Sequence, residues 1–194
     1  MKVLIVYAHP NPKSLNHAIL EILKKELAQS GHEVDVVDLY AMRFNPVLSG
    51  DELAGLMEGK VVKEVKEQQE KVSCADALVL VHPIWWTGAP AVLKGWIDRV
   101  LALGFAYCFD EKQGTLIGLL KNRKVLIINT AGASEQDALA SGMTEAVRKV
   151  EVEMVFQHCG IQDVKHVVFY NVPRSDEATR KKYLEKVREL AKGL

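Results

Sequence analysis

Short, continuous runs of apolar residues mark the strands that this sequence predicts. The runs 3–7, 77–81 and 125–128 are rich in valine, isoleucine and leucine and lack the alternation of a half-exposed strand. This pattern is typical of strands that are buried on both faces of a parallel sheet. Two weaker runs, 33–38 and 164–170, bring the predicted number of strands to five.

Apolar residues recur at helical spacing between these runs. The stripes are Leu15, Ile19, Ile22, Leu23 and Leu27; Val61, Val65 and Val72; Val92, Leu93, Trp96, Ile97 and Val100; and Ala146, Val147, Val150, Met154 and Val155, which Gly160 ends. Ser175 is expected to cap a last helix, because acidic residues favour the first turn and two follow it. The stretches 40–59 and 107–120 have neither pattern and are expected to be functional loops.

Strands that alternate with helices predict an α/β fold, with an open parallel sheet and helices on both of its faces. A length of 194 residues fits one domain over 1–194. Lys and Arg number 25, as do Asp and Glu. This balance argues against a nucleic-acid partner, which needs an excess of positive charge, and against an acidic electron carrier.

Targeting signals and cysteine motifs are not apparent in the sequence. The first apolar run is too short for a signal peptide, and no apolar stretch of about 18 residues follows. We therefore expect a cytoplasmic protein with no transmembrane segment. Cys74, Cys108 and Cys159 are widely spaced, which favours reduced thiols and gives no metal motif. His17 and His166 are expected on solvated surfaces.

Ligands of open α/β sheets bind at the carboxyl ends of the strands. The segment 9–16, which follows the first strand, has neither a GxGxxG nor a GK[ST] motif. It does place Ser14 before a helix, and a helix N-terminus with free N–H groups favours an anion. Ser14, Leu15 and Asn16 are therefore candidates to bind phosphate, with His9 as a further donor. The alternative is that Ser14 only caps the helix.

Two adjacent tryptophans, Trp85 and Trp86, follow the strand 77–81. Side chains alternate along a strand, so both cannot point inward, and one is expected to face the rim. A flat aromatic wall suits a planar ligand such as a flavin or a quinone; the alternative is that both rings belong to a core or to an interface. The segment that follows the strand 125–128, from Asn129 to Gly132, has small residues that would let the edge of a ligand approach the backbone.

The stretch 83–100, PIWWTGAPAVLKGWIDRV, resembles the signature of the NAD(P)H:quinone oxidoreductases with a flavodoxin-like fold. That family includes DT-diaphorase, modulators of drug activity and the ancillary quinone reductases of potassium-efflux systems. The match continues in 8–16, 38–46, 104–107 and 130–132, in order and at similar spacing. It implies a five-stranded parallel sheet in the order 2-1-3-4-5 and a homodimer with flavin at the subunit interface.

The resemblance also implies roles for individual residues. The segment at the flavin phosphate is matched by His9, Ser14, Leu15 and Asn16, the segment along the isoalloxazine by Pro83, Ile84, Trp85 and Trp86, and the loop at its polar edge by Asn129, Thr130, Ala131 and Gly132. Aromatic residues that line the substrate pocket from the partner subunit, opposite Trp86, are matched by Tyr107 and Phe109. An arginine at the adenosine of FAD is matched by Arg180.

The implied activity is hydride transfer from NAD(P)H through a flavin to a quinone or related acceptor, with ping-pong kinetics. FAD is the expected cofactor and FMN the alternative. The larger relatives have a tyrosine and a histidine after the Thr-Gly-Gly loop as a proton relay, and the stretch 134–143 has neither. No catalytic residue is therefore assigned. Two other functions remain open: a flavodoxin-type electron carrier, and a flavin-binding ancillary subunit of a transporter.

Overall fold

The computed structural model describes residues 1–110, 112, 114–120 and 123–194. Its central sheet has five strands: β1 (Lys2–Tyr7), β2 (Glu33–Asp38), β3 (Ala77–Pro83), β6 (Lys124–Thr130) and β7 (Asp163–Phe169). They lie in the order β2-β1-β3-β6-β7, and every neighbouring pair is parallel. Counted within this sheet the order is 2-1-3-4-5, so the predicted flavodoxin-like fold is confirmed.

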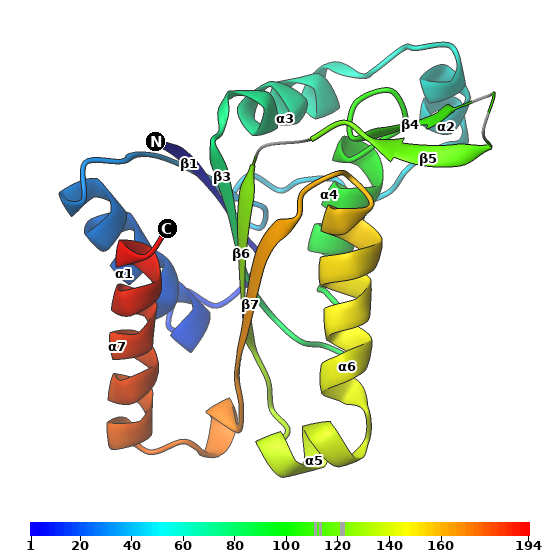
Figure 1. The fold of residues 1–194 in the computed structure, drawn as a ribbon. Helices are drawn as coiled ribbons and strands as arrows, with labels where there is room; N and C mark the ends of the chain where they lie inside the picture. Colours follow the sequence, from blue (N-terminus) through cyan, green and yellow to red (C-terminus); the bar gives the residue numbers. More distant parts are fainter. Residues whose placement is uncertain (111, 113, 121–122) are drawn as a thin grey trace.

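Helices cover both faces of the sheet (Figure 1). Helices α1 (Leu15–Gln29) and α7 (Glu177–Lys192) lie on one face. Helices α3 (Lys63–Cys74), α4 (Ala91–Val100) and α6 (Met143–Arg148), with its π-helical continuation η1 (Lys149–Gln157), lie on the other. Strand β3 is buried at every position, because apolar side chains from both layers pack against it.

Both stretches that were expected to be irregular contain regular elements. Helix α2 (Gly50–Met57) lies within 40–59, and the antiparallel hairpin of β4 (Tyr107–Asp110) and β5 (Thr115–Gly118) lies within 107–120. These elements are short and mostly exposed, so they lack the apolar pattern that identifies longer ones. Two further short helices, α5 (Glu135–Ala140) and η2 (Val172–Arg174), follow β6 and β7.

The segment before α2 is held against α4 by two residues of the 83–100 motif. A Cβ atom at Gly95 would lie 2.1 Å from the carbonyl oxygen of Pro46, so only glycine permits this approach. Arg99 is 4% exposed and donates to Glu52 at 2.9 Å and to Glu64 at 2.8 Å. Part of the motif is therefore explained by packing and not by ligand binding.

Two predicted helix boundaries are wrong. Asp176, not Ser175, caps α7, because its carboxylate accepts the N–H of Thr179 at 2.7 Å. The Ser175 hydroxyl donates instead to the carbonyl of Val172. Val61 lies outside α3, which begins at Lys63.

The apolar stripe predicted between Ala146 and Val155 is only partly buried. Val150 and Met154 are each 51% exposed, whereas Glu151, Val152 and Phe156 face the sheet. A π-helix has more residues per turn than the 3.6 on which the predicted stripe was based, so the buried face shifts along η1. Within the described residues, no helix is long and apolar enough to cross a membrane.

Candidate functional site

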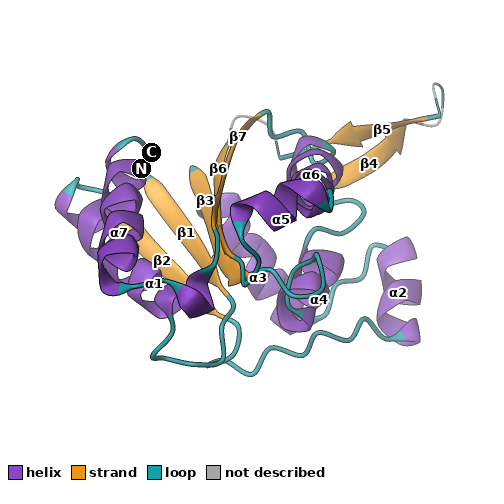
Figure 2. Ribbon diagram, turned by 90° about the horizontal axis from the view of Figure 1, so that it is seen from below, coloured by secondary structure: helices purple, strands orange, loops and turns teal. Residues whose placement is uncertain are grey.

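A cavity of about 650 Å³ lies at the carboxyl edge of the sheet. Figure 2 views the molecule from this edge, where the loops after β1, β3 and β6 converge. It is lined by His9, Asn11, Lys13, Ser14, Leu15, Asn16, Ala18, Pro83, Ile84, Trp85, Thr130, Ala131, Gly132, Val172, Pro173, Arg180 and Leu184. All the cofactor residues expected from the sequence are therefore brought together, except Trp86 and Asn129.

The N-terminus of α1 forms one wall of this cavity. Ser14 caps the helix, since its hydroxyl accepts the N–H of His17 at 3.2 Å. The first N–H groups of a helix have no acceptor within the helix, and those of Leu15 and Asn16 are among them. Ser14 therefore acts as a cap and also lines an edge suited to an anion.

Asn16 gives this wall a buried acceptor without a partner. Its side chain is only 2% exposed, and Nδ2 donates to Thr130 Oγ1 at 2.7 Å. Its Oδ1 has no hydrogen-bond partner among the described residues. An unpaired buried acceptor costs free energy, so a group that donates a hydrogen bond in the cavity would be stabilised there.

His9 adds a donor on the same side. Its Nδ1 accepts the backbone N–H of Asn11 at 3.0 Å, so the neutral ring carries its proton on Nε2. Burial lowers the pKa of His9. The ring centroid lies 6.2 Å from that of Trp85.

The two tryptophans stand on a tight turn after β3. Trp85 and Gly88 exchange backbone hydrogen bonds at 2.9 and 3.0 Å. The residues between them are left-handed, with φ of 50° at Trp86 and 59° at Thr87. Trp85 is 42% exposed and lines the cavity, while Trp86 is 103% exposed and does not. One ring, that of Trp85, thus faces the rim as expected, and Trp86 is exposed as well, because alternation ends where the strand gives way to a turn.

Asn129 lies below the cavity and not in its wall. The side chain is fully buried and contacts His82 and His166. His166, which the sequence places on a solvated surface, is half-buried and hydrogen-bonded, because β7 faces η1 on that side. Only the next residue of β6, Thr130, reaches the cavity.

Tyr107 and Phe109 do not reach the cavity of their own chain. They lie on β4 and line a separate hollow with the end of α4 and with η1. Figure 1 shows the hairpin far from the carboxyl edge. Phe109 is 60% exposed, and its ring meets that of Tyr107 edge-on at 6.0 Å. Their expected role at the site therefore requires a second copy of the chain.

Several lining residues were missed by sequence reasoning. Lys13 precedes the helix cap and brings a positive charge, while Val172, Pro173 and Leu184 come from η2 and α7. Lys13 lies within the segment 9–16 and could have been found there. The others follow the weakest predicted strand, and their place depends on how α7 packs beside α1.

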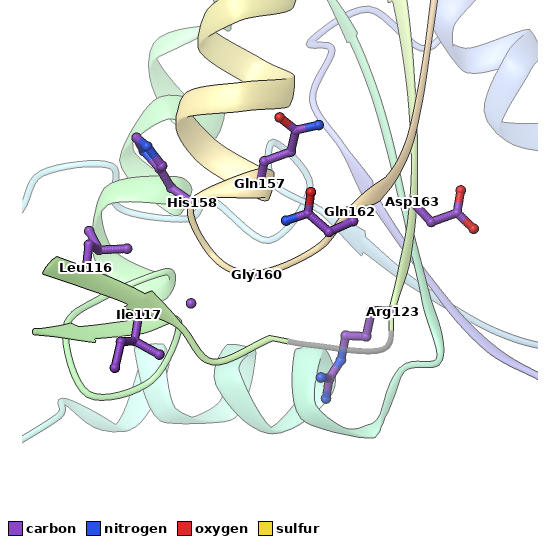
Figure 3. Close-up of a pocket in the computed structure, with 9 residues that line it drawn as sticks. Leu116, Ile117, Arg123, Gln157, His158, Gly160, Gln162 and Asp163 are labelled. Carbon is purple, nitrogen blue, oxygen red and sulfur yellow. The ribbon is translucent and has the colours of Figure 1, made fainter. Parts of the chain in front are cut away.

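A second hollow of about 680 Å³ lies near the amino ends of β6 and β7. Figure 3 shows Gln157, Gln162 and His158 around the loop at Gly160, next to β5. None of the site residues expected from the sequence lines it. No group of histidine, cysteine and acidic side chains within the described residues has the arrangement of a metal site.

Known proteins with similar sequences share this fold. An uncharacterized NAD(P)H oxidoreductase of Haemophilus influenzae is 34% identical over 186 residues, covering 95% of this chain and 91% of the relative. The NAD(P)H:quinone oxidoreductase of Methanothermobacter marburgensis superposes with a TM-score of 0.89 at 30% identity, covering 99% of this chain and 96% of that one. The general stress protein 14 of Treponema denticola, in complex with FMN, has a TM-score of 0.68 at 25% identity, covering 98% and 95%. Residues 1–191 match the family described as the flavodoxin-like fold, and the chain belongs to that family.

Proposed function

We propose that this chain is a flavin-dependent NAD(P)H:quinone oxidoreductase. The observation that carries the proposal is the unpaired, buried Oδ1 of Asn16 beside the N-terminus of α1, in a cavity large enough for a flavin. The relatives named as NAD(P)H oxidoreductases support the same activity. The FMN bound by a structural neighbour supports the cofactor class.

The residues of the cavity suit the parts of a flavin. Ser14, Leu15 and Asn16 would hold its phosphate with the free N–H groups of α1, and His9 would donate from Nε2. Lys13 would add positive charge at the same edge. Pro83, Ile84 and Trp85 would lie along the ring, and Thr130, Ala131 and Gly132 would lie at its polar edge.

A bound flavin supplies the chemistry of hydride transfer between NAD(P)H and an acceptor. The chain would bind and orient the ring, with Trp85 as one wall. In a homodimer, Tyr107 and Phe109 of one subunit would complete the pocket beside Trp86 of the other. Such a pocket would hold the two substrates in turn and give ping-pong kinetics. In a single chain Trp86 and Phe109 are exposed and Tyr107 is half-buried, so an interface could still cover them.

We further propose FAD as the flavin. Arg180 and Leu184 of α7 extend the cavity beyond the N-terminus of α1, which leaves a wall for the adenosine half. Arg180 is held in place by its Nε, which donates to Ser175 Oγ at 3.0 Å. Its terminal nitrogens remain available to stack on adenine or to bind a phosphate oxygen.

The proposal is tested with the purified full chain, incubated with FMN or FAD and freed of unbound flavin. We expect a yellow protein that oxidises NADH or NADPH in the presence of 2-methyl-1,4-naphthoquinone, with parallel lines in double-reciprocal plots. Asn16→Leu should weaken flavin binding. Gln69→Leu removes a buried amide outside the cavity, which donates to Val100 at 3.0 Å, and should leave binding unchanged. A protein that takes up neither flavin would refute the proposal.

A further inference from the structure

Four polar side chains interrupt the apolar core directly below the cavity. His82 and Asn129 are fully buried, Glu151 is 5% exposed, and His166 is half-buried. His82 on β3 is the register partner of Asn129 on β6. His166 comes from β7 and Glu151 from η1, two elements that lie side by side in Figure 1. We refer to these four residues as the buried cluster.

Hydrogen-bond geometry fixes the protons of the two histidines. His82 Nδ1 lies 3.0 Å from the carbonyl oxygen of Pro83, which can only accept, so Nδ1 carries a proton. Nε2 of a neutral His82 then accepts from Asn129 Nδ2 at 3.0 Å. The amide is thereby oriented, and Asn129 Oδ1 accepts from His166 Nε2 at 2.5 Å.

Glu151 is the member of the buried cluster whose contact would improve if one more proton were bound. Its Oε2 lies 3.4 Å from His82 Nε2, and neither carboxylate oxygen has a hydrogen-bond partner among the described residues. An ionised carboxylate would face the lone pair of Nε2 in a dry interior, which is costly. A proton on either atom makes the contact favourable. With both histidines neutral and Glu151 ionised, the four residues carry one negative charge. One additional proton makes the group electrically neutral.

The buried cluster is separated from the cavity by a single residue on each strand. His82 precedes Pro83, and Asn129 precedes Thr130; both of the following residues line the cavity. Charges interact strongly over such short distances where water is excluded. A negative charge in the cavity would thus raise the proton affinity of the cluster below it.

We propose that the buried cluster takes up a proton when the cavity above it gains negative charge by reduction, and releases that proton on oxidation. This inference rests on the proposed flavin function, because reduction of a bound flavin is the source of the charge. The proton comes from solvent by way of half-buried His166. No electron enters the cluster, and no covalent bond changes apart from those to the proton. The cluster would balance charge in a chain whose stretch 134–143 has neither tyrosine nor histidine.

The surroundings of His166 agree with a neutral ring in the resting protein. Burial lowers the pKa of His166, Glu151 raises it, and His82 and Arg148 lower it further. Arg148, at the end of α6, is itself paired with Glu145 at 2.8 Å and Glu153 at 2.6 Å. The charged groups that act on the ring thus come from β3, α6 and η1.

Proton uptake has a structural signature in the amide of Asn129. When His82 Nε2 is protonated, it can no longer accept from Asn129, so the amide must turn. Oδ1 then accepts from His82, and Nδ2 donates to His166 Nε2, whose proton must move to Nδ1. The tautomer of His166 therefore reports the proton on His82, which a purely structural hydrogen bond would not do.

The test uses the full chain loaded with FMN and labelled with ¹⁵N at histidine. Flavin binding is first established by absorbance. Imidazole nitrogen shifts are then followed against pH in the oxidised protein and in the protein reduced by dithionite without oxygen.

We expect the buried cluster to titrate about one pH unit higher in the reduced protein, which is a tenfold gain in proton affinity. The tautomer of His166 should exchange over the same range. The flavin potential should also steepen by about 30 mV per pH unit over that range, the value for one more proton in a two-electron couple.

Matched variants separate the cluster from its neighbours. Glu151→Gln should abolish the redox-linked shift, whereas Glu153→Gln, which removes the same charge from a more exposed position on η1, should retain it. If Glu151→Gln does not fold, His166→Gln serves instead: it removes the route from solvent and should abolish the redox-linked shift at His82. Bound flavin with histidine shifts that do not depend on redox state would overturn this inference alone. Failure to bind flavin would overturn the proposed function and this inference with it.

Discussion

Asn16 Nδ2 donates to Thr130 Oγ1 at 2.7 Å and so ties the start of α1 to the end of β6 across 114 residues of sequence. The bond is buried and positions the one Asn16 oxygen that has no partner among the described residues. The two residues therefore align the edge suited to phosphate with the edge suited to the flavin ring.

Thr130→Val removes the acceptor of this bond and leaves a buried amide donor unpaired. The free energy of unfolding should fall by about 1–3 kcal/mol, and flavin affinity should fall as well, because Asn16 is free to turn. Thr130→Ser keeps the hydroxyl and should stay close to the unsubstituted protein. Urea unfolding and flavin titration measure both effects, and equal behaviour of the two variants would contradict this reading.

The tryptophans at positions 86 and 96 should behave in opposite ways. Trp96 is fully buried and donates to Gln68 at 3.3 Å, so Trp96→Ala should cost about 3–5 kcal/mol of stability. Trp86 is fully exposed at a φ of 50°, so Trp86→Ala should leave stability nearly unchanged. It should instead weaken flavin binding or acceptor turnover. Equal activity losses in two well-folded variants would show that Trp86 has no special place at the site.

Arg180→Ala distinguishes the two flavins. If FAD is bound, its affinity should fall by about 1–3 kcal/mol, the range for a hydrogen bond to a charged group, while FMN affinity should barely change. Lys181→Ala, one position further along α7, removes the same charge from a side chain paired with Glu177 and is the control. Equal weakening of both flavins by Arg180→Ala would place Arg180 at the phosphate that they share.

Phosphate binding should depend on pH through His9. Burial lowers the pKa of His9, so the free protein holds the ring neutral at pH 7. A bound anion favours the charged ring and raises this pKa, so affinity for sulfate, a phosphate mimic whose charge is constant over this range, should rise as pH falls from about 8 to about 6. Without a bound anion the dependence on pH is the opposite. The free energy of unfolding falls as pH drops below about 6.5, the pKa of a histidine in the unfolded chain. His9→Gln should flatten both profiles in calorimetry, whereas His158→Gln, at an exposed position, should not.

Gly95→Ala should be destabilising because the added Cβ would meet the backbone of Pro46 at 2.1 Å. Backbone cannot yield as a side chain does, and we expect a loss of about 1–3 kcal/mol. Gly50→Ala, where a Cβ meets nothing within 4 Å, is the control and should be neutral or slightly stabilising. Thermal unfolding of the two variants would decide whether the glycine of the 83–100 motif serves packing.

The parallel sheet could be predicted from the sequence because its strands are buried on both faces. Such burial leaves apolar runs such as 77–81 that require no knowledge of the partners. Most residues of the cavity could be predicted as well, because parallel strands end at one edge and Ser14, Pro83 and Thr130 all follow strand ends. The hairpin of β4 and β5 could not, since its short strands are half-exposed and have no such pattern.

The sequence by itself thus determined the order of the elements, the edge at which they converge and the chemistry of the residues there. Only the tertiary structure decided which side chains enter the cavity. Asn129 turns away from it because His82 and His166 satisfy its amide in the core, and Trp86 turns away because a left-handed turn replaces the strand. Burial and hydrogen-bond pairing depend on residues distant in sequence, here up to 114 positions apart. Local sequence patterns therefore cannot predict which side chains are buried or paired.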